Sequence, residues 1–277
     1  DMNQVTISNL MIQIKEEPLS EDLVRHMVLN SLRSYKTKFS KDFGELVLCY
    51  DDKYCWRKDY FPYYKQNRKK ARSESSLDWN ELFDILTKIQ NELEENFPYK
   101  VLKIDGAEAD DIIAILSNKI SSTPNLYEDI LIISGDKDFI QLHQKENIKQ
   151  YSPTLKKYVV DANPEHYKFE HIIRGDKGDG VPNVLSQDTV FVEDLRQRPI
   201  TKKKLTEWKE NGIPEGEIKR NYQRNKILID FDSIPNELGE LIYNKWVDKI
   251  TQNDKSKILP YFMKHRLKEL TEKLGDF

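Results

Sequence analysis

The segment 129–134, DILIIS, is apolar almost throughout and stops at a glycine, which makes it the clearest strand signal in the sequence. Two similar runs, 45–50 (ELVLCY) and 100–104 (KVLKI), precede it. Continuous apolar runs are typical of parallel strands covered by helices on both faces. The stretches 78–96 and 108–120 between them have amphipathic helical spacing. This alternation predicts an α/β fold with a mostly parallel central sheet and helices on both faces.

The pattern changes after residue 180, where strand signals give way to amphipathic stretches punctuated by prolines. We therefore expect an α/β domain over 1–180 and a helical C-terminal region over 181–277. Within the first domain, the stretch at about 56–75 is basic, and its second half has no apolar periodicity. It is the segment we expect to form a mobile bridge.

Composition indicates whether the protein is soluble and in which compartment it acts. The chain has 277 residues and a net charge of −3, with 38% hydrophobic residues and no apolar run long enough to span a membrane. Its start has no secretory signal pattern. The cysteines, Cys49 and Cys55, form neither a zinc-type pair nor a disulfide framework. We expect a soluble protein of a reducing, cytoplasmic compartment.

Acidic residues follow the predicted strands at equivalent places. Asp51 follows the strand 45–50, and Asp136 and Asp138 follow 129–134. Glu108, Asp110 and Asp111, in the motif EADD, open the helix that follows 100–104, and the motif GDKGDG comes later. Because ligands of parallel α/β sheets bind beyond the carboxyl ends of the strands, these acids are expected to converge.

A cluster of carboxylates without histidine or cysteine selects Mg²⁺ or Mn²⁺. Two such ions can activate water and stabilise the leaving oxygen in phosphodiester hydrolysis. Any single acid of this kind is an ordinary turn or helix-capping residue. The three motifs in this order favour a shared metal site.

The basic segment 56–72, WRKDYFPYYKQNRKKAR, carries seven Lys or Arg and one Asp, interleaved with aromatic residues. Cations bind phosphates, and aromatic rings stack on unpaired bases. For Trp56 and Phe61 we favour a place in the core. The residues expected to bind phosphates from a bridge over the site are Arg68, Lys69, Lys70 and Arg72.

Together these motifs resemble the 5′ nuclease family, which includes flap endonucleases, the 5′ exonuclease domains of bacterial DNA polymerases and phage exonucleases. The resemblance extends over most of the chain, through VLCYDD, IDGAEADDIIAIL, LIISGDKDFIQLH, RGDKGDGV and NKILIDFDSIPNEL. Within the family it points to the ribonuclease H group of T-even bacteriophages. It implies 5′-3′ exonuclease, flap endonuclease and ribonuclease H activity in the removal of RNA primers and adjoining DNA.

The resemblance also implies roles for individual residues. The first metal site would use Asp1, Asp51, Glu108, Asp110, Asp111 and Asp136, directly or through water. The second would use Asp138, Asp176 and Asp179, and Asp136 could be shared between the two. Arg57 and Lys65 match basic residues beside the scissile phosphate. The implied cofactors are two Mg²⁺, for which Mn²⁺ can substitute.

The sequence departs from the family pattern in two places. The family has an apolar strand before its first acidic ligand, whereas this sequence begins at Asp1, so that strand is expected to be missing. Relatives outside the T-even group have a glycine-rich helix–hairpin–helix after the last acids. Here the stretch 181–194, VPNVLSQDTVFVED, contains no glycine. Duplex binding by that element is therefore not expected.

Two other hypotheses remain open. A PIN-like RNA nuclease shares an acidic α/β site in a shorter chain, and a catalytically impaired DNA-binding protein would keep the basic segment. No Ser or Cys nucleophile stands out, and the histidines show no metal-ligand spacing: they are His26, His143, His166, His171 and His265. The implied partners are RNA–DNA hybrid, duplex and flap or fork DNA, with a single-stranded-DNA-binding protein or sliding clamp of the replisome. We expect a monomer, encoded by a phage and acting in the bacterial cytoplasm.

Overall fold

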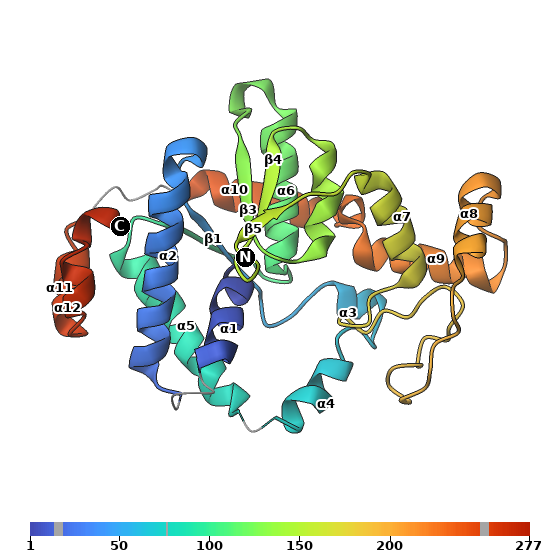
Figure 1. The fold of residues 1–277 in the computed structure, drawn as a ribbon, viewed down its shortest axis with the longest axis horizontal. Helices are drawn as coiled ribbons and strands as arrows, with labels where there is room; N and C mark the ends of the chain where they lie inside the picture. The colour runs from blue at the N-terminus through green and yellow to red at the C-terminus, as the bar shows by residue number, and fades with distance from the viewer. Residues whose placement is uncertain (14–18, 76, 250–254) are drawn as a thin grey trace.

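The computed structural model of the chain describes residues 1–13, 19–75, 77–249 and 255–277. It is an α/β fold that is mostly helical, with two small sheets (Figure 1). The first sheet pairs β1 (Val47–Tyr50) in parallel with β2 (Lys100–Lys103). In the second sheet β3 (Ile130–Ile133) is parallel to β4 (Ile148–Ser152), and β5 (Lys157–Val159) is antiparallel to β4. The predicted strands at 45–50, 100–104 and 129–134 are thus confirmed.

The helices packed around the first sheet are α1 (Met2–Gln13), α2 (Glu21–Phe43), α5 (Trp79–Asn96), α6 (Ala109–Ser122) and α10 (Asn236–Asp248). Alternate side chains of this sheet enter different cores, because successive residues of a strand point to opposite faces. Leu48 and Val101 pack in one cluster with α1, α2 and α5. Cys49 and Leu102 pack in a second cluster with α6 and α10. Helices therefore cover both faces of this sheet, as predicted.

The prediction of one central sheet is wrong, because among the described residues no strand pairs with both β1 and β3. A cavity of about 320 Å³ lies between these two strands, lined by residues that include Cys49, Ile113, Leu131 and Ile133. Neighbouring strands of one sheet lie about 4.8 Å apart. The cavity therefore fills space between β1 and β3 that a further strand of one sheet would occupy.

Helix α5 confirms the amphipathic helix predicted over 78–96. It begins at Asp78, whose side chain accepts hydrogen bonds from the N–H groups of Asn80 and Glu81. Its buried face includes Leu82 and Leu93, both fully buried. Helix α6 likewise matches the one predicted from residue 108, with Glu108 at its N-cap position.

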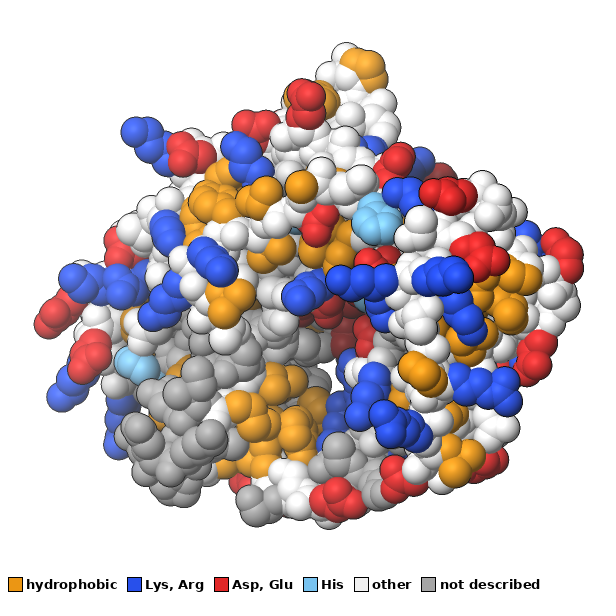
Figure 2. All heavy atoms as spheres, turned by 45° about the vertical axis from the view of Figure 1, so that its right-hand side comes forward, with side chains coloured by type: hydrophobic (Ala, Val, Ile, Leu, Met, Phe, Trp, Pro, Cys, Tyr) orange, Lys and Arg blue, Asp and Glu red, His pale blue; other side chains and the backbone are white. Residues whose placement is uncertain are grey.

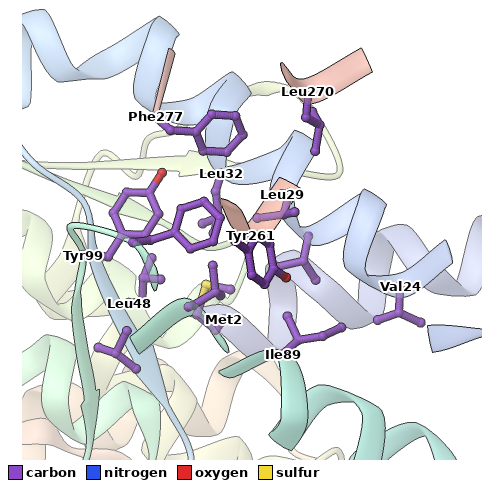
Figure 3. Close-up of a cluster of buried hydrophobic side chains, with 14 of the residues drawn as sticks. Met2, Val24, Leu29, Leu32, Leu48, Ile89, Tyr99, Tyr261, Leu270 and Phe277 are labelled. Carbon is purple, nitrogen blue, oxygen red and sulfur yellow. The ribbon is translucent and has the colours of Figure 1, made fainter. Parts of the chain in front are cut away.

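The first core joins the two ends of the chain (Figure 3). Met2 of α1, Leu29 of α2 and Ile89 of α5 pack there with the C-terminal Phe277. The rings of Phe97 and Phe277 lie 5.7 Å apart, centroid to centroid. The last helices, α11 (Ile258–Lys264) and α12 (Lys268–Thr271), supply further residues of this core, so the end of the chain packs on α2 and α5.

Beyond β5 the named elements are all helices, as predicted for the C-terminal region. The helices that follow β5 begin with α7 (Pro164–Arg174), α8 (Lys202–Asn211) and α9 (Glu217–Ile229). Short 3₁₀ segments lie on either side of β5: η1 (Pro124–Leu126) and η2 (Lys137–Gln144) before it, and η3 (Phe231–Ser233) and η4 (Leu274–Asp276) after it. Helix α7 packs against both η2 and α9. In the described ranges no helix has the length and apolar character needed to cross a membrane.

Candidate active site and metal centre

The basic segment forms two short helices, α3 (Arg57–Tyr60) and α4 (Asn67–Ser73), joined by turns (Figure 1). It is held against the loop that follows α7. The backbone N–H of Lys65 donates to the carbonyl oxygen of Asp179 over 2.8 Å, and Asn67 Nδ2 donates to the carbonyl oxygen of Lys177 over 2.7 Å. Lys65 has a φ of 56°, a conformation that costs energy outside glycine and often occurs at functional sites.

Beside this segment, a small pocket collects acids from parts of the chain far apart in sequence. Its acidic lining residues are Glu108, Asp110, Asp138, Asp176 and Asp179. Figure 2 shows acidic side chains at the floor of a hollow whose rim carries Lys and Arg side chains. The expected convergence of the EADD, SGDKD and GDKGDG motifs is therefore present in the fold.

The remaining expected acids lie around this pocket. Asp51 accepts a 2.8 Å hydrogen bond from the N–H of Ala109, at the start of α6. Asp1 accepts a 2.9 Å hydrogen bond from the hydroxyl of Ser134, at the end of β3. Asp136 caps η2 by accepting a 3.0 Å hydrogen bond from the N–H of Asp138.

Burial and mutual repulsion raise the pKa of three of these carboxyls. Burial raises the pKa of Asp110 well above its ordinary value, and the neighbouring Asp136 and Asp51 raise it further. Burial also raises the pKa of Asp136. It raises the pKa of Asp138 to about 8, with Asp136 and Asp176 adding to the effect and His171 opposing it. A divalent cation would remove this electrostatic cost.

These shifts predict how stability depends on pH. A carboxyl whose pKa is raised by folding binds more protons when folded, so stability falls as pH rises from the ordinary carboxyl range toward 8. In EDTA we expect the melting temperature to fall between about pH 5 and about pH 8, and Mg²⁺ or Mn²⁺ to restore it at the upper pH. Asp138→Asn should flatten this dependence. A melting temperature in EDTA that is constant or rises over this range would contradict the prediction.

Glu108 differs from these acids because cations already neutralise it. Lys65 Nζ lies 2.5 Å from its Oε1, and Arg57 lies 3.1 Å from its Oε2. Burial would raise its pKa, but Lys65 and Arg57 outweigh burial and hold that pKa at about 2. The hydroxyl of Tyr64 bridges Glu108 and Asp179, at 2.9 and 2.7 Å. Sequence reasoning did not single out this tyrosine, because its role depends on two distant carboxylates.

Asp111 and Arg57 occupy environments different from those expected. Asp111 is fully buried, and its two oxygens accept hydrogen bonds of 3.0 and 2.8 Å from the guanidinium of Arg57. It also accepts from the N–H of Glu108, which closes a capping box, and from Trp56 Nε1. Arg57 in turn donates to the carbonyl oxygen of Leu228 over 2.8 Å. This geometry favours a structural ion pair beneath the site over a metal ligand and a phosphate-binding arginine.

The expected phosphate-binding residues of α4 lie in three settings. Arg68 pairs with Asp179, and Lys69 is exposed. The guanidinium of Arg72 lies over the rings of Trp79 and Phe83, 5.4 and 4.9 Å from their centroids. The side chain of Lys70 lies outside the described part of the chain.

Phe61 is buried and Trp56 is half-buried, so both contribute to the hydrophobic core as predicted.

The turn that carries Asp176 depends on a glycine. Gly175 has a φ of 67°, and a Cβ there would lie 2.3 Å from the carbonyl oxygen of Val181. Asp176 follows and accepts hydrogen bonds from the N–H groups of Gly178 and Asp179, at 2.6 and 3.1 Å. The GDKGDG motif is thus a tight turn that directs two carboxylates toward the pocket.

A histidine to which the sequence assigned no metal-binding role also lies at this site. His171, in the last turn of α7, has Nδ1 3.3 Å from Asp138 and Nε2 3.6 Å from Asp176. The three side chains can each offer one ligand atom within 4.8 Å of the others. The signal that points to it is its position five residues before Asp176, which is weak without the fold.

The glycine-free stretch 181–194 forms turns, and no helix of the structure begins or ends within it. Its backbone is held by α9. Arg224 and Asn225 both donate to the carbonyl oxygen of Pro182 over 2.8 Å. Arg224 also pairs with Asp188. A helix–hairpin–helix is therefore absent from this described stretch, as the missing glycines predict.

Comparison with known proteins identifies the family. Residues 21–171 match the family described as 5′-3′ exonuclease, N-terminal resolvase-like domain. The chain belongs to the 5′-3′ exonuclease family. Residues 162–277 match the family described as T4 RNase H, C terminal. The chain is a nuclease and therefore a phosphodiester hydrolase, which the sequence motifs predicted.

Individual relatives of this 5′-3′ exonuclease agree. It is 36% identical to ribonuclease H of Enterobacteria phage T4 over 293 residues, which cover 100% of this chain and 94% of the relative. It is 30% identical to a 5′-3′ exonuclease of Buchnera aphidicola over 52% of this chain and 49% of the relative. A structure of T5 5′-exonuclease with bound zinc has a TM-score of 0.60 at 17% identity, covering 88% of this chain and 96% of that chain. That last likeness establishes the fold.

Proposed function

We propose that this exonuclease hydrolyses 5′ ends and flaps with two Mg²⁺ ions, for which Mn²⁺ can substitute, and removes RNA primers and adjoining DNA during lagging-strand replication. The observation that carries the proposal is the pocket in which Glu108, Asp110, Asp138, Asp176 and Asp179 meet beside the basic segment. One solved structure with the same fold is a T5 flap endonuclease in complex with DNA and metal ions, at a TM-score of 0.60 and 18% identity. Its substrate class supports the assignment of flap DNA.

The donor set fits divalent cations. Asp110, Asp136 and Asp138 are half-buried carboxyls that repel one another, an arrangement that is stable when a cation neutralises it. When bound, two such ions supply activation of water and stabilisation of the leaving oxygen. We assign the first ion to Asp1, Asp51, Glu108, Asp110 and Asp136 and the second to Asp138, Asp176 and Asp179. Asp111, already paired with Arg57, is left out of the first set.

Lys65 and Tyr64 are the residues of the basic segment that we expect to act on the scissile phosphate. Their polar atoms both contact Glu108 and Asp179, so they lie at the boundary between the two groups of carboxylates. The ammonium group of Lys65 pairs with carboxylates in this structure. With substrate bound, it would move to the scissile phosphate and stabilise the negative charge that develops there during cleavage.

Matched flap, nicked and RNA-primed substrates test this function. In Mg²⁺ we expect release of labelled nucleotides from the 5′ end of a primer and cutting at the base of a flap, with none in EDTA. Cleavage of single-stranded RNA without a 5′ end, or metal-independent cleavage, would contradict the proposal.

The basic segment offers a test of substrate binding. Lys69 is exposed on α4, next to Arg68. Lys69→Glu should weaken binding of flap DNA and lower the salt dependence of log K by roughly 0.7–0.9 for each phosphate that the protein no longer neutralises. Fluorescence anisotropy at several salt concentrations measures both quantities. As a matched control, Lys264→Glu on α11 makes the same exchange of charge on an exposed residue away from α4. Equal effects of the two changes would show that α4 has no specific role.

A further inference from the structure

His171 differs from the other groups of the second metal site because it offers nitrogen. Its Nδ1 lies 3.3 Å from Oδ1 of Asp138, and its Nε2 lies 3.6 Å from Oδ2 of Asp176. Two ligand atoms bound at right angles to one ion, at about 2.1 Å each, lie about 3 Å apart. The separation of His171 Nδ1 from Asp138 fits that geometry.

Among the described residues, the His171 nitrogen that faces Asp138 lies near that carboxylate without a hydrogen bond. Nδ1 of His171 is buried and has no hydrogen-bond partner among the described residues. A buried polar atom without a partner is costly, and a bound ion is one arrangement that satisfies it. The T-shaped packing of the Tyr167 ring, 5.6 Å from the imidazole, fixes the ring plane.

We infer that Nδ1 of His171 is a ligand of the second divalent ion, together with Asp138 and Asp176. This inference rests on the proposed two-ion function. The first site, around Asp51 and Asp110, is made of oxygen donors, which suit Mg²⁺. An imidazole ligand favours first-row transition metals such as Zn²⁺ and Fe²⁺ over Mg²⁺. The two sites of this chain therefore differ in metal preference, and the second is the one that selects a transition metal.

Mn²⁺ bound to the full-length protein provides a direct readout that does not depend on cleavage. At two Mn²⁺ per chain, pulsed electron paramagnetic resonance should detect the coupling of a directly bound imidazole nitrogen. That coupling should disappear in His171→Gln, which keeps a polar side chain of similar reach. His166→Gln, on the same helix but more exposed, is the matched control and should retain it.

Affinity gives a second, independent readout. By calorimetry His171→Gln should lose roughly tenfold or more in Mn²⁺ affinity at one of two sites, and clearly less in Mg²⁺ affinity. Two bound Mn²⁺ with no nitrogen coupling in the unmodified protein would overturn the inference and leave the proposed nuclease function standing; His171 would then only balance the charge of the carboxylates. Failure to bind Mn²⁺ at all would overturn both.

Discussion

Asp110→Asn is expected to reduce cleavage of a 5′-labelled primer–template by roughly a thousandfold or more. The Asp110 carboxyl lies among other acids, and a bound cation would offset their mutual repulsion and supply the chemistry of cleavage. Asn has the same shape without the charge, so the fold should be retained. The melting temperature in EDTA should stay the same or rise, because a repulsive group is removed.

Binding of DNA separates a catalytic defect from a folding defect in this variant. Flap DNA should bind Asp110→Asn at least as tightly as the unmodified protein, since one fewer negative charge faces the phosphates. Asp105→Asn is the matched control, because Asp105 is exposed in the loop that precedes α6. Cleavage by Asp110→Asn at more than about a tenth of the normal rate would contradict its assignment as a ligand.

Asp111→Ala is expected to lower the free energy of unfolding by about 3 kcal/mol or more. Asp111 is fully buried and makes two hydrogen bonds to the guanidinium of Arg57. Removing Asp111 leaves the buried guanidinium of Arg57 with only Glu108 as a carboxylate partner, and breaking a buried pair costs about 3–5 kcal/mol. Trp56 Nε1 and the N–H of Glu108 would also lose their acceptor. Urea denaturation followed by circular dichroism measures the loss.

An exposed ion pair provides the comparison for Asp111. Lys119 and Glu240 lie 3.1 Å apart with side chains 42% and 62% exposed, so Glu240→Ala should cost less than about 1 kcal/mol. If Asp111→Ala kept normal stability but lost metal binding, Asp111 would be a ligand, as the family resemblance first implied, and its structural role would be wrong.

Much of the scaffold could be predicted from local signals. The apolar runs that became β1, β2 and β3 are short and continuous, and α5 has both a capping residue at Asp78 and a regular apolar face. In contrast, β4 has the sequence IKQYS, which is polar at several of its positions although Gln150 is buried. Gln150 is stabilised there by hydrogen bonds to the carbonyl oxygens of Ser134 and Asp136, which no local pattern reveals.

Helix α2 was not predicted, although the sequence carries local signals for it. It has apolar residues at helical spacing, including Val24, Val28 and Leu32, but most of its other positions are polar. Its N-cap, Ser20, is a recognisable start signal. Both local signals of this helix are thus present in the sequence, so it was predictable without the fold.

In the site too, features set by neighbouring residues could be predicted from the sequence, and contacts between distant residues could not. The convergence of EADD and SGDKD could be predicted because each of these motifs follows a predicted strand. The partners of those acids could not, since Arg57 and Asp111 are 54 residues apart and Tyr64 and Asp179 are 115 apart. His171 joins Asp138 only because α7 packs on η2.

Counting bound ions tests most directly whether these distant carboxylates share a pair of cations. Calorimetric titration of the metal-free protein with Mn²⁺ at about pH 7.5, in parallel with Asp110→Asn and Asp138→Asn, is the measurement required. We predict two saturable sites in the unmodified protein, with a different one weakened in each variant. Absence of saturable binding, or identical isotherms for all three proteins, would contradict the account.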